Sequence, residues 1–539
     1  MSTVPLGTAP GRRGPITRRR FIQAVAAVGG TTAAWSAMSA WGHLAEAKQT
    51  APPTLPGESS GARIIILGAG PAGLVAGYEL GRKGYDVQIL EADDRVGGHV
   101  FTVRRGSRTH ELGGEEQICD FDEGQWYDAG AWRIPYVHRG IHHYLREFQI
   151  PTIHHTDINM NAYSYVSGIR GPLNERPVRL REAIVDMRGY TAELLAKGLN
   201  QDQLDQELSQ EDRDAFIAYL ISVGLLSADD LSYQPNVARG WSGLDLAADQ
   251  REVPTAPFPL EDLLPFAEAA GDLTPLGDLL HQPVMQKPAN GMSQIFEEGF
   301  QPQLADRLTL GAEVREVRQS ESGVEIIYFN KSTGETNTAT ADYCISTIPL
   351  SVLNRMRTDL SGPIQEAIQG SAYSAVGKLG LQFGRRFWEE DDWIYGGLTI
   401  TNVPEIGTIS YPTWDYHTPK GVLQGYYNFG NTAMTVSRLS LQDRIELGLE
   451  FGSKIHPQYR QEYEAGFSVA WHRMPYAMGG WAGWSDYAKQ HFYPRLFEPD
   501  GRIYFAGDFM SQIPGWIEGA IQAAWLQIDK LHQRVMQAA

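Results

Sequence analysis

Residues 64–98 decide the fold and read IIILGAGPAGLVAGYELGRKGYDVQILEADDRVGG. The continuous apolar run at residues 64–67 is typical of a strand that is buried on both faces of a sheet. A glycine-rich turn at residues 68–73 follows it and leads into a helical segment, after which a second apolar strand ends at Glu91. Strand, turn, helix and strand in this order predict a β-α-β unit and therefore an α/β fold.

The glycines of this turn have the G-x-G-x-x-G spacing of a dinucleotide-binding loop. Gly68 allows the tight turn, Gly70 lets the backbone approach a pyrophosphate, and Gly73 lets the helix pack closely on the strand. The N-terminus of the helix then presents free N–H groups and a partial positive charge to the phosphates. Glu91, about 20 residues beyond the turn, can accept hydrogen bonds from both ribose hydroxyls, which favours FAD or NAD over NADP.

The segment after the second strand distinguishes these two cofactors. Residues 91–98 read EADDRVGG and resemble the E-A-x-x-R-x-G-G signature of the FAD-dependent amine oxidase superfamily, the monoamine oxidase-like enzymes. The resemblance implies FAD, with the extra glycines and the arginine continuing the cradle around the flavin diphosphate. The superfamily usually has arginine after the paired glycines, whereas this chain has His99, which removes one permanent positive charge. The FAD contacts that the resemblance implies are Gly68, Gly70, Pro71, Ala72, Gly73, Glu91, Ala92, Arg95, Gly97, Gly98, Gly130, Ala131, Trp132, Val314, Trp471, Gly507, Asp508, Trp516 and Ile517.

The same resemblance implies the domain organisation. It predicts a discontinuous Rossmann-like FAD-binding domain, a mixed-sheet α+β substrate domain and a helical insertion. We expect the FAD-binding domain at residues 63–137, 286–349 and 497–539, with its first part running into the substrate domain. Amphipathic patterns predict a mainly helical insertion at residues 138–285, which we expect to shape the substrate entrance, and the substrate-binding domain at residues 350–496.

The N-terminal residues 1–47 are typical of a targeting signal. Residues 17–23 resemble the twin-arginine motif that directs folded proteins across the bacterial inner membrane, and residues 45–47 have the small-x-small pattern of a cleavage site. The alternative is a basic membrane-anchoring helix, which the glycines and threonines at residues 29–32 disfavour. We therefore expect interaction with the export machinery, a periplasmic or secreted enzyme, and a linker at residues 48–62.

Composition excludes several classes of partner. The formal net charge of -18 argues against nucleic acid and anionic membrane surfaces. Outside the N-terminus, no apolar run is long enough for a permanent membrane span. Two cysteines, Cys119 and Cys344, are too few for a disulfide framework or a structural zinc site. Adjacent histidines, at residues 142–143 and 154–155, point in different directions, so we expect no metal.

Arg133 is the first candidate for substrate binding. It lies between apolar and aromatic neighbours just ahead of Pro135, and burying such a charge is costly without an anionic partner. That partner is either an internal Asp or Glu or the carboxylate of a substrate. The local sequence resembles the G-x-M-R-x-P segment of flavin-dependent L-amino-acid oxidases, with Trp132 in place of methionine. This resemblance implies that Arg133 grips the substrate carboxylate, for which its planar fork is suited.

Three further candidates lie in the expected substrate domain. Lys378 is inside an apolar strand, and its family counterpart holds a water near the reactive flavin nitrogen; the alternative is an edge lysine that reaches solvent. Tyr411, before Pro412, matches the family tyrosine that shares the substrate carboxylate with the arginine, and the alternative is an ordinary half-buried tyrosine. Trp471, which precedes a Y-A-x-G-G turn, matches the family's flavin-adjacent tryptophan.

The C-terminal region closes the expected site. A strand ends in Gly507-Asp508, and Gly515-Trp516-Ile517 opens a final helix and resembles the family's G-W-I motif, which borders the reacting carbon. A helix N-terminus aimed at the flavin pyrimidine would stabilise the negative charge that develops on reduction. The resemblance implies one catalytic residue, Lys378, and substrate contacts from Arg133, Tyr411, Trp471, Trp481, Gly515 and Trp516.

The resemblance implies FAD-dependent oxidation of L-amino acids to 2-oxo acids, with oxygen as acceptor and release of ammonia and hydrogen peroxide. An amino-acid 2-monooxygenase and an amine or polyamine oxidase are the alternatives, and a flavin-binding chaperone or structural protein without turnover is a third class. The tryptophans near the motifs, with no obvious acid beside them, favour neutral apolar or aromatic substrates. We expect a homodimer.

Overall fold

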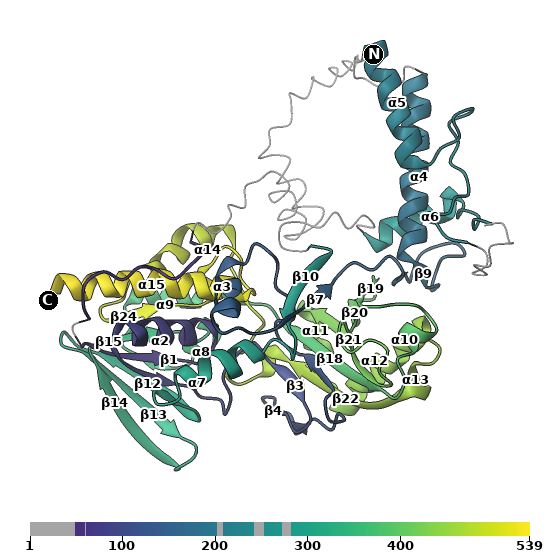
Figure 1. Ribbon diagram of the computed structural model, residues 1–539. Helices are drawn as coiled ribbons and strands as arrows, with labels where there is room; N and C mark the ends of the chain where they lie inside the picture. The colour runs from purple at the N-terminus through teal and green to yellow at the C-terminus, as the bar shows by residue number, and fades with distance from the viewer. Residues whose placement is uncertain (1–48, 60, 202–208, 242–252, 272–281, 539) are drawn as a thin grey trace, which may run out of the picture.

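The computed structural model describes residues 49–59, 61–201, 209–241, 253–271 and 282–538. Figure 1 shows two adjoining bodies, one around β1 and α15 and one around β18 and β21, with a helical hairpin that projects from them. The predicted signal at residues 1–47 lies outside the described residues. In the part of the chain that the structure describes, we find no helix with the length and hydropathy that crossing a membrane requires.

A five-stranded parallel sheet forms the centre of the first body. Its order is β11 (Leu308–Thr309), β2 (Asp86–Leu90), β1 (Arg63–Leu67), β15 (Tyr343–Ser346) and β24 (Ile503–Phe505). These strands come from three separate parts of the chain, so the FAD-binding domain is discontinuous, as the resemblance implied. Helices α2 (Pro71–Lys83) and α15 (Ile517–Ala538) cover one face of the sheet and bury Ile64 and Ile66 of β1.

A second sheet lies against the other face of the parallel sheet. Its order is β14 (Glu335–Ala341), β13 (Val324–Asn330), β12 (Ala312–Gln319) and β16 (Arg357–Thr358). Apolar residues of β12 and β13, among them Val317 and Ile326, share a core with Ile65 and Leu67 of β1. The two sheets therefore form one packed unit around the predicted dinucleotide-binding loop.

The second body contains a seven-stranded mixed sheet. Its order is β22 (Tyr463–Ala470), β18 (Val376–Phe383), β21 (Gly421–Phe429), β20 (Thr408–Tyr411), β19 (Gly397–Thr401), β8 (Tyr163–Tyr165) and β9 (Val178–Arg179). Only β19 and β8 pair in parallel; the other neighbours are antiparallel. Strand β18 is buried along its whole length, partly because α12 (Leu441–Ile455) packs on the sheet.

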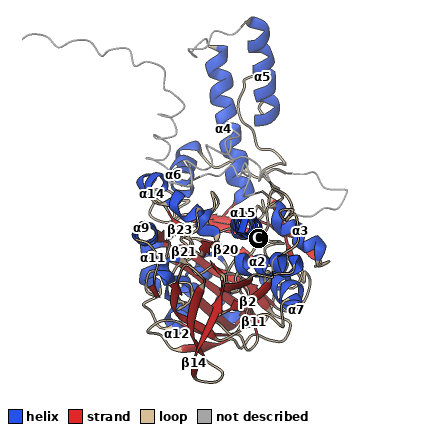
Figure 2. Cartoon of the chain, turned by 90° about the vertical axis from the view of Figure 1, so that its left-hand side faces the viewer, coloured by secondary structure: helices blue, strands red, loops and turns tan. Residues whose placement is uncertain are grey.

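The segment at residues 138–285, expected to be mainly helical, contains more strand than predicted. Helix α3 (Arg139–Glu147) is followed by β7 (Thr152–Thr156), and then by β8 and β9 of the large sheet. Helices α4 (Leu180–Asn200), α5 (Gln210–Gly224) and α6 (Leu260–Ala270) come later, and β10 (Val284–Pro288) returns to pair with β7. The described part of the segment is therefore mainly helical, and its short strands were not predicted because strands this short leave no clear alternation in the sequence. Figure 2 shows α4 and α5 standing away from the sheets.

The remaining strands and α-helices are short and lie around these sheets. They are the strands β3 (Thr102–Arg104), β4 (Arg108–His110), β5 (Glu116–Ile118), β6 (Trp126–Asp128), β17 (Ala372–Tyr373) and β23 (Ala482–Gly483), and the helices α7 (Gln301–Gln303), α8 (Leu350–Leu353), α9 (Gly362–Gln369), α10 (Phe387–Glu390), α11 (Gly430–Val436), α13 (Tyr459–Glu462) and α14 (Asp486–His491).

The carboxyl ends of the parallel strands meet at one edge of the sheet, where open α/β sheets bind their ligands. Gly68 follows β1, Glu91 follows β2, Thr347 follows β15, and Asp508 lies just after β24. The topology therefore brings the sequence motifs at both ends of the chain to one place.

Candidate active site

A cavity of about 1540 Å³ runs from this edge of the parallel sheet to strands β18 and β21. It exceeds the roughly 300–1,000 Å³ of ordinary ligand pockets, so it has room for a dinucleotide and a substrate together. Of the predicted site residues, Gly73, Gly97 and Tyr411 do not line it. Those that do are Gly68, Gly70, Pro71, Ala72, Glu91, Ala92, Arg95, Gly98, Gly130, Ala131, Trp132, Arg133, Val314, Lys378, Trp471, Trp481, Gly507, Asp508, Gly515, Trp516 and Ile517.

The glycine-rich turn has the shape that a diphosphate requires. Gly68 has φ of +102°, and a Cβ there would lie 2.6 Å from the Thr347 hydroxyl oxygen. A Cβ on Gly73 would lie 2.0 Å from the Gly68 carbonyl oxygen, so Gly73 supports the turn from outside the cavity. Gly97 does the same by donating its N–H to the Ala69 carbonyl at 2.9 Å. The bare backbone of Gly70 is left facing the cavity, which fits close approach by the FAD diphosphate.

Glu91 is held in place for ribose binding. Its two carboxylate oxygens accept hydrogen bonds from the backbone N–H groups of Ala69, at 2.6 Å, and Asp93, at 2.7 Å. Burial raises the pKa of this carboxyl group, and the two N–H donors oppose that effect. Each oxygen keeps a second lone pair for a ribose hydroxyl, so the arrangement fits the adenosine half of FAD.

Arg95 organises the loop that follows Glu91. Its guanidinium donates to the Gly98 carbonyl at 2.8 Å and to the Val100 carbonyl at 3.2 Å, and lies 4.3 Å from the centre of the Phe101 ring. These contacts hold the paired glycines against the turn, where a Cβ on Gly98 would lie 3.2 Å from Gly70 Cα.

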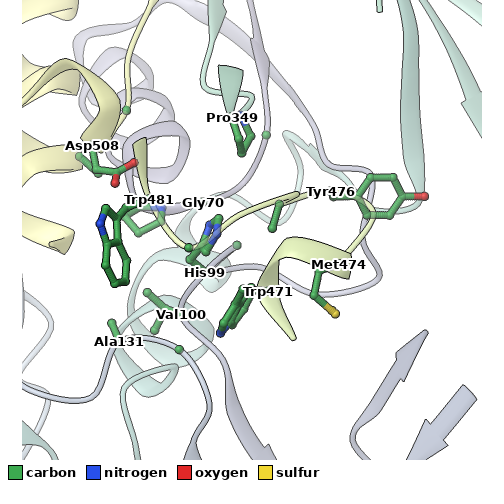
Figure 3. A pocket seen from close by; sticks show the side chains of 18 of the residues that line it. Gly70, His99, Val100, Ala131, Pro349, Trp471, Met474, Tyr476, Trp481 and Asp508 are labelled. Atoms are coloured by element: carbon green, nitrogen blue, oxygen red, sulfur yellow. The ribbon is translucent and has the colours of Figure 1, made fainter. Parts of the chain in front are cut away.

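His99 occupies the middle of the cavity wall in Figure 3. Its Nε2 lies 2.6 Å from the Gly479 carbonyl, and its ring stacks on Trp471 at 4.7 Å between centroids. Burial lowers the pKa of His99, while the Asp508 carboxylate raises it and Arg95 lowers it further. The arginine that the resemblance implies at this position is thus replaced by a group that can titrate.

The C-terminal motif forms another wall. Asp508 accepts a hydrogen bond from the Gly515 N–H at 2.7 Å, and burial raises the pKa of its carboxyl group. Gly515 has φ of +83°, and a Cβ there would lie 3.2 Å from the Trp481 ring. Helix α15 then begins at Ile517 on the cavity wall, which directs its N-terminus toward the space expected for the flavin.

Lys378 is buried, with a side chain only 1% exposed, which rules out a solvated edge lysine. Its Nζ donates to the Gly130 carbonyl at 2.6 Å and lies 4.5 Å from the centres of the Trp132 and Tyr427 rings. Burial lowers the pKa of Lys378 well below its ordinary value, which favours the neutral amine.

Arg133 lines the cavity and also pairs with an internal acid. Its position is therefore compatible with both anions considered from the sequence, an internal carboxylate and the carboxylate of a substrate. Its Nη1 lies 2.9 Å from each carboxylate oxygen of Asp157, in the loop after β7. The guanidinium lies 4.9 Å from the Trp132 ring and 5.8 Å from the Trp516 ring. Its buried Nε makes no hydrogen bond to any residue that the structure describes. Asp157 thus engages Nη1, while Arg133 as a residue remains on the cavity wall.

The structure does not support the position predicted for Tyr411. Its hydroxyl bonds to Thr399 at 2.7 Å and to His456 at 2.6 Å, one strand away from β21. Tyr427 lines the cavity instead, opposite Lys378 in the β18–β21 register, and burial raises the pKa of its hydroxyl to about 12. The alternation of Tyr427 and Phe429 on one face of β21 was the available signal, and it could be read only with the strand pairing known.

No group of three or more His, Cys, Asp or Glu side chains among the described residues could hold a metal ion.

Comparisons with known proteins agree on one family. The model of the family described as "Flavin containing amine oxidoreductase" matches residues 71–527. The chain is 27% identical over 479 residues to L-amino-acid oxidase BmooLAAO-I of Bothrops moojeni, covering 86% of this chain and 87% of that protein. It is 25% identical over 480 residues to an L-amino-acid oxidase of Crotalus adamanteus, covering 86% and 85%.

Solved structures show the same fold at low sequence identity. Cyclohexylamine oxidase from Brevibacterium oxydans IH-35A superposes with a TM-score of 0.57 and 16% identity, covering 88% of this chain and 99% of that chain. A putrescine oxidase bound to putrescine superposes with a TM-score of 0.56 and 19% identity, with the same coverage.

Proposed function

The chain belongs to the flavin-containing amine oxidoreductase family, with FAD as its cofactor, and within that family we propose that it oxidises L-amino acids to 2-oxo acids. Ammonia and hydrogen peroxide are the other products. The observation that carries this proposal is Arg133, a guanidinium on the cavity wall near the rings of Trp132 and Trp516. The two snake-derived L-amino-acid oxidases support the same substrate class.

Different residues of the cavity have different roles in the proposed reaction. Arg133 binds the substrate carboxylate through charge-assisted hydrogen bonds, and the Tyr427 hydroxyl adds a neutral one. Trp471 and Trp516 supply flat apolar walls that orient the substrate and exclude water. Bound FAD would supply the oxidising chemistry for removal of a hydride from the α-carbon of the substrate. Lys378 is buried with a lowered pKa and, as the family resemblance implies, holds a water near the reacting centre.

Neutral aromatic or apolar amino acids fit this cavity best. Trp132, Tyr427, Phe429 and Trp481 line the end that contains Arg133 and Lys378. Large flat side chains would gain apolar contact there.

An amine oxidase is the second candidate, and the Arg133–Asp157 ion pair is the observation that favours it. An arginine that already has an anion does not need a substrate carboxylate to be stable in a buried site. An amino-acid 2-monooxygenase uses the same carboxylate contacts and differs only in its products.

Product analysis separates these reactions. Incubating the holoenzyme with L-phenylalanine, and separately with 2-phenylethylamine, should give phenylpyruvate, ammonia and hydrogen peroxide from the amino acid and little product from the amine. Phenylacetamide with carbon dioxide would identify the monooxygenase. Faster turnover of the amine would reject amino-acid oxidation in favour of the amine oxidase.

We also propose that the enzyme is exported by the twin-arginine route and forms a homodimer. The export proposal rests on the motif at residues 17–23. The dimer proposal rests on the hairpin of α4 and α5, which exposes Leu194, Phe216 and Tyr219 to solvent. Apolar residues gathered on a projecting element are typical of a protein interface. Light scattering of the parent and of Leu194→Glu tests it, since a dimer at this surface should shift toward monomer in the variant.

A further inference from the structure

Asp157 does not line the cavity itself, but it pairs with Arg133, which lines the end where the proposed substrate carboxylate binds. Both of its carboxylate oxygens lie 2.9 Å from Arg133 Nη1, and its side chain is only 8% exposed. His155 Nε2 lies 3.1 Å from Asp157 Oδ1, and burial lowers the pKa of His155, which favours the neutral imidazole. Asp157 therefore balances the charge of Arg133 before any substrate arrives.

The other charges of this region are already matched. Lys287 lies 2.6 Å from Asp128, which also accepts hydrogen bonds from the Thr102 hydroxyl at 2.6 Å and the Met292 N–H at 2.9 Å. Lys378 is buried, and its lowered pKa favours the neutral amine. A carboxylate that binds Arg133 thus enters a region whose net charge is close to zero, with Asp157 as the acid on the same guanidinium.

We propose that Asp157 is a specificity-determining residue that weakens the hold of Arg133 on carboxylates by sharing its guanidinium with them. This inference rests on the proposed function, because it concerns the substrate carboxylate. Two anions on one cation repel each other, and the repulsion is stronger in a buried site than in water. The 2-oxo acid product keeps the carboxylate and loses the amine, so the same repulsion would speed its release. An acidic amino acid, with a second carboxylate, would be disfavoured further.

The test measures ligand binding without turnover. Benzoate, an anion, and benzamide, its neutral counterpart, are titrated into the FAD-loaded enzyme, and binding is followed by the change in flavin absorbance. Asp157→Asn removes the charge and keeps the shape and an acceptor for Arg133. Asp157→Glu keeps the charge, and Asp157→Ala removes both charge and acceptor. Asp122→Asn is a control for total charge, because Asp122 pairs with Lys420 at the surface and does not line the cavity.

We expect benzoate to bind at least about tenfold more tightly to Asp157→Asn than to the parent, which corresponds to about 1.4 kcal/mol. Benzamide affinity should change less than about twofold, and Asp157→Glu and Asp122→Asn should behave as the parent. Asp157→Ala should show the same direction if Asp157→Asn does not fold. Benzoate affinity that stays the same, falls, or cannot be detected in either protein would overturn the proposal. If the parent oxidises amines and not amino acids while benzoate binding tightens, the proposed function fails and the role of Asp157 stands.

Discussion

Replacing Arg133 by methionine tests carboxylate recognition most directly. Losing charge-assisted hydrogen bonds to the substrate carboxylate should cost about 1.5–3 kcal/mol, a loss of about 10- to 150-fold in kcat/KM. The loss is larger if the misplaced substrate also transfers its hydride more slowly. Because Arg133 pairs with Asp157, the substitution also leaves a buried carboxylate without its cation, which costs about 3–5 kcal/mol of unfolding free energy. The double variant Arg133→Met/Asp157→Asn should recover much of that stability and none of the activity.

The assay compares L-phenylalanine with 2-phenylethylamine, which differ by the carboxylate. Oxygen consumption gives kcat/KM for both substrates, absorbance gives the flavin content, and thermal unfolding gives the stability. Both variants should lose at least about tenfold on the amino acid and little on the amine. Equal losses on both substrates with full flavin content would refute recognition of the carboxylate by Arg133.

Three further predictions concern other residues. Tyr427→Phe should lower kcat/KM for L-phenylalanine by about 2- to 12-fold, because one neutral hydrogen bond to the substrate is lost. Tyr411→Phe should lower the melting temperature and leave kcat/KM unchanged, and the opposite pattern would identify Tyr411 as the substrate contact. Protonated His99 attracts the diphosphate, so FAD should bind the apoprotein more weakly as the pH rises through the pKa of His99. His99→Arg should flatten this pH dependence in a fluorescence titration, and identical pH profiles for the parent and the variant would argue against a role of His99. Changing Arg18 and Arg19 together to lysine should stop export, measured by cell fractionation, and undiminished export would reject the twin-arginine route.

The loop expected to bind the cofactor could be predicted from the sequence because its shape depends on residues that are close together in the chain. Gly68 and Gly73 act on their own turn, and Glu91 reaches back to the turn from the end of the neighbouring strand. Spacing along the chain is therefore enough to place these residues. The same reasoning extends to Gly515, whose turn directly precedes α15.

The substrate end depends on strand pairing, which local sequence does not specify. Tyr427 faces the cavity because β21 pairs with β18 and sets it opposite Lys378. Tyr411 has the expected local motif but lies on β20, where its hydroxyl hydrogen-bonds with His456. From the sequence we expected an anionic partner for Arg133, either an internal acid or a substrate carboxylate. The contact with Asp157 could not be predicted, because it depends on the position of the loop after β7.

The parallel sheet has one consequence for biosynthesis. Strand β24 pairs with β15, and α15 covers the sheet, so the last part of the chain completes the unit that starts at β1. Contacts between residues so far apart in sequence form slowly, and they cannot form while the C-terminal segment is still in the ribosome. The nascent chain must keep its apolar strands from aggregating until β24 and α15 have emerged, because these two elements complete the sheet and the cavity wall.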